Sequence, residues 1–170
     1  MSNRDKIRDI IVLAILLAMG IVLNILDSLI PMPFGLRLGL ANIVGLFALY
    51  IFGYREALIV TILRILIASA LRGTFGSITF FMALPSGIVA IAVMWLLKKF
   101  TPFGKIVIST IGALVHSATQ IVVAVIIMES PGVFAMLPVM LLIAVATGIL
   151  IGIISDRFIK IYDTAIKKQN

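Results

Sequence analysis

Long uninterrupted apolar runs constrain this chain more than any other feature of its sequence. They lie at about residues 10–30, 39–53, 57–72, 78–97, 106–128 and 133–154, separated by charged residues, proline or glycine. A helix needs about 20 apolar residues to cross the hydrocarbon core of a bilayer, whereas a transmembrane strand shows alternating hydrophobicity. The runs therefore predict an all-α polytopic membrane protein, a bundle of six transmembrane helices in a single domain over residues 1–170.

The composition agrees with lipid as the main solvent. Of the 170 residues, 62% are hydrophobic and 12% charged, whereas soluble domains average about 45–50% apolar and about 25% charged residues. Six spans with short loops leave no room for a soluble enzyme domain. The run at 39–53 is the shortest, and it needs local thinning of the bilayer or snorkelling of Arg37 to span it.

The basic residues predict the orientation. With the N-terminus inside the cell, eleven of the 14 Lys and Arg residues fall on cytoplasmic segments, as the positive-inside rule requires. These eleven are Arg4, Lys6, Arg8, Arg55, Lys98, Lys99, Lys105, Arg157, Lys160, Lys167 and Lys168. We expect a multi-pass protein of the cell membrane with both termini in the cytoplasm. The same asymmetry explains most of the net charge of +7 without nucleic-acid binding.

A set of polar side chains falls between mid-membrane and the outer surface of the predicted bundle. Ionisable groups are costly inside a bilayer, so each of them calls for a partner or a water-filled cavity. Three arginines and a histidine against one aspartate favour an anionic group such as carboxylate or phosphate. We expect an outward-facing pocket that binds a small anionic or amphipathic solute. The candidate residues are Arg64, Arg72, Arg37, Asn42, Asp27, Asn24, His116 and Gln120.

Structural explanations compete with ligand binding at these positions. Arginines at helix ends, such as Arg37, can snorkel to lipid headgroups. Asp27 can serve only to neutralise an arginine in an ion pair. His116 and Gln120 lie four residues apart on one helix face and can supply interhelical hydrogen bonds. Arg64 fits such explanations least, because it lies about eight residues from either end of its run.

Motifs of several enzyme classes are missing from the sequence. With no cysteine and one histidine, we expect no metal site and no catalytic triad. The Gly104-Lys105 pair is followed by Ile106, so no Walker A motif occurs. No two acidic residues form a pair within a predicted span, which argues against two-metal and glycosidase chemistry. We expect a binding protein without enzymatic activity and without a cofactor.

Small residues recur at four-residue spacing in two of the predicted spans. Ala14 and Ala18 share one face of the first span, and Ala144, Gly148 and Gly152 share one face of the last. Such stripes let helix backbones approach closely, either within the bundle or against another subunit. The sequence leaves both alternatives open.

Four segments together resemble a known family. They are Arg37-Leu-Gly-Leu-Ala-Asn42-Ile, the turn Gly53-Tyr-Arg-Glu56, the stretch from Arg64 to Gly73, and Ala83-Leu-Pro-Ser-Gly87. Over essentially the whole chain they resemble the Gx transporter family, which is also catalogued as heptaprenyl diphosphate synthase component I. That family is in turn similar to the substrate-binding S components of energy-coupling factor (ECF) transporters, which are six-helix proteins with both termini in the cytoplasm.

The resemblance implies a subunit of an importer. S components bind substrate near the outer surface and dock through an alanine-rich face of the first helix onto a transmembrane T component, which two ATPase subunits drive. Ala14 and Ala18 match that alanine pattern. The second catalogue name implies an alternative, a membrane accessory of prenyl diphosphate or quinone metabolism that does not transport. Autonomous secondary transport ranks last, because the chain shows no obvious inverted repeat and few ionisable groups.

Overall fold

The computed structural model describes residues 3–30 and 37–167, in which helices are joined by short turns and loops and no strand occurs. The all-α prediction is therefore confirmed. The long apolar runs explain this outcome, because a helix satisfies its backbone hydrogen bonds within one segment and so suits an apolar solvent. The elements are α1 (Asn3–Ser28), α2 (Asn42–Ile51), α3 (Tyr54–Leu71), α4 (Ile78–Phe100), α5 (Lys105–Met128), the 3-10 helix η2 (Pro131–Met136) and α6 (Leu137–Lys167).

Four of these helical segments are long and apolar enough to cross a membrane. They are Lys6–Ser28, Ile78–Phe100, Lys105–Met128 and Pro131–Tyr162. The chain is therefore a multi-pass membrane protein in contact with lipid. With ten residues, α2 is about 15 Å long, half of a hydrocarbon core of about 30 Å. The prediction of six spans depends on how α2 and the charged helix α3 lie in the bilayer, and it stays a prediction.

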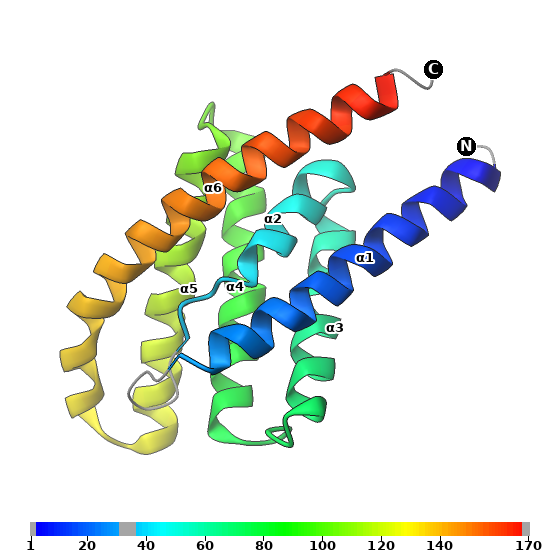
Figure 1. The fold of residues 1–170 in the computed structure, drawn as a ribbon. Coiled ribbons are helices and arrows are strands. Elements are labelled where there is room, and N and C mark those ends of the chain that lie inside the picture. Colours follow the sequence, from blue (N-terminus) through cyan, green and yellow to red (C-terminus); the bar gives the residue numbers. More distant parts are fainter. Residues whose placement is uncertain (1–2, 31–36, 168–170) are drawn as a thin grey trace.

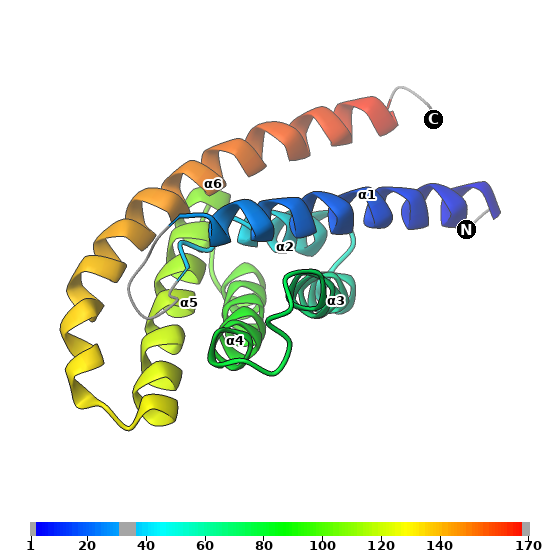
Figure 2. The same cartoon turned by 60° about the horizontal axis from the view of Figure 1, so that its bottom comes forward.

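The helices form two layers. In Figures 1 and 2, α3, α4 and α5 make one layer, and α1, α2 and α6 make the other, with the short α2 between the two long helices. Both ends of the described chain lie at one end of the molecule, together with the α4–α5 connection, whereas the α3–α4 and α5–α6 connections lie at the opposite end (Figure 1). Termini at one end are what an even number of crossings requires. The side of the membrane that this end faces stays a prediction.

Glycines let α6 pack against α5 at backbone distance. A Cβ atom at Gly148 would lie 2.6 Å from Thr110 Cα, and one at Gly152 would lie 2.6 Å from Ile106 Cα. Ala144, in the same stripe, is 1% exposed. The small-residue stripe of the last helix is therefore an internal packing surface between α5 and α6.

Candidate functional site

One buried pocket brings together seven of the eight polar residues that the sequence singled out. It lies where α1, α3, α4 and α5 meet the segment that leads into α2, and none of the seven side chains is more than 8% exposed. The cavity measures about 20 Å³, which is about enough for one water molecule. Its polar lining consists of Asn24, Asp27, Arg37, Asn42, Arg64, His116 and Gln120, and its remaining lining consists of Gly39, Ala41, Ile65 and Ala83.

Arg72 is the one predicted residue that does not line this pocket. It follows the last residue of α3, and its Nε donates a hydrogen bond to the carbonyl oxygen of Ala68 at 3.0 Å. The sequence grouped Arg72 with the others by its expected depth. Depth alone does not determine the direction of a side chain at a helix end, and here the guanidinium Nε turns back onto its own helix.

Asp27 anchors the segment that leads into α2. Its Oδ1 accepts a hydrogen bond from the backbone N–H of Leu38 at 3.1 Å, and its Oδ2 accepts one from the N–H of Gly39 at 2.9 Å. Gly39 has a φ of +79°, a left-handed conformation that glycine adopts without strain. Among the described residues, no ion pair within 4.0 Å joins Asp27 to an arginine. The partner of this carboxylate is therefore backbone, which the sequence did not indicate.

Arg37 connects two helices across the pocket. Its Nη1 donates to Oδ1 of Asn24 in α1 at 3.0 Å, and its backbone N–H donates to Oε1 of Gln120 in α5 at 3.1 Å. Nε2 of Gln120 lies 2.7 Å from Nε2 of His116. Burial, followed by the charge of nearby Arg72, lowers the pKa of the Arg37 guanidinium to about 10. The group therefore carries its charge at neutral pH.

The side chain of Arg64 packs against α1 where it reaches the pocket. Its Cδ lies so close to Gly20 that an added Cβ there would be 2.9 Å away, so a glycine in α1 makes room for the arginine. The Nη2 atom of Arg64 donates a long hydrogen bond of 3.4 Å to Oδ1 of Asn42. Arg64 Nε and Asn42 Nδ2 are buried without a hydrogen-bond partner. The sequence offered no signal for the role of Gly20, because the close approach depends on how α1 crosses α3.

The charges of the pocket do not balance. Among the described residues that line the pocket, Arg37 and Arg64 carry two positive charges and Asp27 carries one carboxylate, whose two oxygens already accept backbone hydrogen bonds. Buried polar groups are nearly always hydrogen-bonded, so unpaired donors beside two guanidinium groups are suited to an acceptor that arrives from outside. Carboxylate and phosphate oxygens are the acceptors that arginine binds in a bidentate manner.

Ala14 and Ala18 lie on the side of α1 that faces away from the bundle, and both are exposed. Ala18 belongs to a shallow groove of about 430 Å³ that is lined by Ile15, Ala18, Met19, Val22 and Leu23. The described bundle therefore does not use this face for its own packing. Its use by a partner subunit stays a prediction.

Comparison with known proteins identifies a family. A family model described as heptaprenyl diphosphate synthase component I matches residues 16–158, a range that includes every residue lining the polar pocket. No curated protein and no solved structure gives a significant match. Because the matched range covers most of the 170 residues, the chain belongs to the heptaprenyl diphosphate synthase component I family.

Proposed function

We propose that this protein is the substrate-binding membrane subunit of an ECF-type importer, similar to an S component, and that it captures a small anionic or amphipathic solute in the polar pocket. One observation carries the proposal: two buried guanidinium groups, from Arg37 and Arg64, line a cavity at which the one carboxylate among the described residues, that of Asp27, already accepts two backbone hydrogen bonds. An apolar bundle that buries such an excess of positive charge needs a compensating anion.

The proposal includes six transmembrane crossings, with the end that holds both termini facing the cytoplasm. The basic residues at that end support this orientation, because cytoplasmic segments carry the excess of Lys and Arg. The polar pocket then lies in the outer half of the bundle, where a solute reaches it from outside the cell. Binding is the whole task of this chain, and the energy for release comes from other subunits.

The cavity is too small for a solute, so we expect binding to break existing contacts between the residues that line it. A volume of about 20 Å³ is far below the roughly 300–1,000 Å³ of ordinary small-molecule sites. Two hydrogen bonds hold Arg37 beside the cavity, one from its guanidinium to Asn24 and one from its backbone N–H to Gln120. We expect the anionic group of the solute to replace the Asn24 contact and to bind the guanidinium directly.

The expected partners are a T component and ATPase subunits, and the expected contact is the alanine face of α1. Ala14 and Ala18 lie on that exposed face. Gly20, on the opposite side of the same helix, touches Arg64. A partner that pulls or tilts α1 therefore acts on the pocket through a single rigid element.

Native mass spectrometry of the protein purified gently from its own membranes tests the proposal, because it detects retained small molecules and associated subunits together. The wild type should retain an anionic metabolite and a T component. Arg64→Ala should lose the metabolite, whereas Arg55→Ala, an exposed arginine on the same helix, should retain it. Arg64→Lys keeps a charge if the alanine variant fails to fold, and it should weaken retention. A metabolite retained equally by every variant, or no anion with the wild type, would contradict the proposal.

A second candidate function is a membrane accessory of prenyl diphosphate or quinone metabolism, which the description of the matched family favours. This alternative predicts that a prenyl synthase or quinone enzyme co-purifies with the chain and that no T component does. Ala18→Leu separates the two functions. It should abolish association with a T component and leave the polar pocket intact, whereas an accessory that contacts its enzyme elsewhere should be unaffected.

A further inference from the structure

A second groove lies far from the polar pocket, between the start of α5 and the C-terminal half of α6. Its volume is about 590 Å³. Along α5, ten residues separate Ile106 in this groove from His116 in the polar pocket, which corresponds to about 15 Å. The groove therefore belongs to the end of the molecule that holds both termini (Figure 1). It is lined by Ile106, Ile153, Asp156, Arg157, Lys160 and Ile161.

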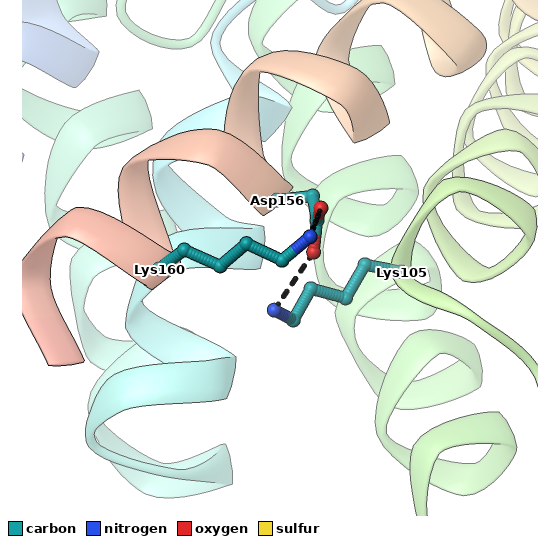
Figure 3. A network of polar contacts seen from close by, with 3 residues as sticks. All are labelled: Lys105, Asp156 and Lys160. Carbon is teal, nitrogen blue, oxygen red and sulfur yellow. Dashed lines mark hydrogen bonds and ion pairs between the residues drawn. The ribbon is translucent and has the colours of Figure 1, made fainter. Parts of the chain in front are cut away.

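Basic side chains outnumber acidic ones at this groove. Figure 3 shows Lys105 of α5 and Lys160 of α6 converging on Asp156, with Nζ–Oδ distances of 3.0 and 2.6 Å. Arg157 is exposed beside them, and no described residue forms an ion pair with it. Three cations against one carboxylate leave two positive charges at the rim of the groove.

The wall of the same groove is apolar and open. Ile106, Ile153 and Ile161 are 40%, 43% and 65% exposed, and all three belong to helical segments that are apolar enough to cross a membrane. Lys105 begins the apolar segment of α5, and Lys160 lies close to the end of that of α6. Cations at the end of an apolar segment are typical of the level of lipid headgroups. The groove thus combines a cationic rim at headgroup depth with an apolar wall below it.

We propose that this groove binds an anionic phospholipid from the leaflet at this end of the molecule. Arg157, Lys160 and Lys105 hold the headgroup phosphate, and an acyl chain lies along Ile106 and Ile153. Charge complementarity favours an anionic lipid over a zwitterionic one, and the apolar wall favours a lipid over a soluble anion. The bound lipid bridges α5 and α6 outside the glycine contact that joins them.

Lipid titration with native mass spectrometry tests this proposal on the full chain in detergent. Dioleoyl phosphatidylglycerol is compared with dioleoyl phosphatidylcholine, and each is added to the wild type and to Arg157→Gln/Lys160→Gln. The variant should lose affinity for phosphatidylglycerol by roughly 30-fold, about fivefold for each basic residue. The matched control, Arg55→Gln/Lys99→Gln, removes two exposed charges outside the groove and should bind like the wild type.

Removing the acidic residue of the groove should increase lipid binding. A variant that loses its structure would not show such an increase. Asp156→Asn removes the carboxylate that Lys105 and Lys160 now bind, so it should raise the affinity for phosphatidylglycerol about fivefold. Equal affinity of the wild type for the two lipids would overturn the proposal. So would an equal loss in the control variant. Complete displacement of the lipid by millimolar inorganic phosphate would overturn it in favour of a soluble-anion site.

Discussion

Replacing Asp27 by Asn tests whether this residue is a ligand contact or an anchor of the chain. The carboxylate is 3% exposed and accepts hydrogen bonds from two consecutive backbone N–H groups, at 3.1 and 2.9 Å. An asparagine of the same shape offers one oxygen and one NH₂ group. One of the two N–H groups would then face another donor, and it would be buried without an acceptor.

The cost of Asp27→Asn follows from these two bonds. A hydrogen bond to a charged group contributes about 1.5–3 kcal/mol, and a buried unsatisfied donor costs about 1–3 kcal/mol. We therefore expect the free energy of unfolding to fall by about 2–4 kcal/mol. For a chain of this length, that corresponds to a decrease in Tm of roughly 5–15 °C. Asp27→Ala removes both acceptors and should cost at least as much.

Thermal unfolding in detergent, followed by the loss of monodisperse protein on size exclusion, measures this decrease. Asp9→Asn is the matched control, because its carboxylate is a half-buried surface group paired only at 3.7 Å with Arg8, and such pairs contribute about 0–1 kcal/mol. An unchanged Tm for Asp27→Asn, together with weaker retention of the bound anion, would refute the hypothesis that Asp27 anchors the segment leading into α2. It would indicate that Asp27 contacts the ligand instead.

Three further predictions concern packing and charge. Gly148→Ala should lower the free energy of unfolding by about 1–2 kcal/mol, since the added Cβ meets α5 backbone, whereas Gly132→Ala has space and should not. Equal Tm values for the two would contradict this. Gly20→Ala should displace Arg64 and weaken anion retention in native mass spectra, and unaltered retention would count against that contact. Because burial lowers the pKa of Arg37 to about 10, binding of a phosphate-bearing ligand should weaken as the pH rises through about 10, and a flat profile there would contradict a lowered pKa at Arg37.

Much of the polar pocket could be predicted from the sequence, because the cost of a polar group in a bilayer is a property of the residue and of its depth. Asn24, Arg64, His116 and Gln120 stand out in apolar runs for that reason alone. The structure brings them together with three other predicted residues around one cavity. Whether they bind a solute stays a prediction that the experiments above address.

Hydropathy is a sum over residues along the chain, and the sequence by itself therefore determined the all-helical class and the membrane environment. The contacts between side chains of different helices depend on how each helix is rotated and where it crosses the others. These depend on packing between segments that are far apart in the sequence, so a local pattern does not predict them. Only the tertiary structure decided that Asp27 accepts hydrogen bonds from backbone N–H groups, that Arg72 bonds to a carbonyl of its own helix instead of lining the pocket, and that Gly20 makes room for Arg64. It also decided between two equivalent stripes of small residues: Gly148 packs inside against α5, whereas the alanine face of α1 is left open.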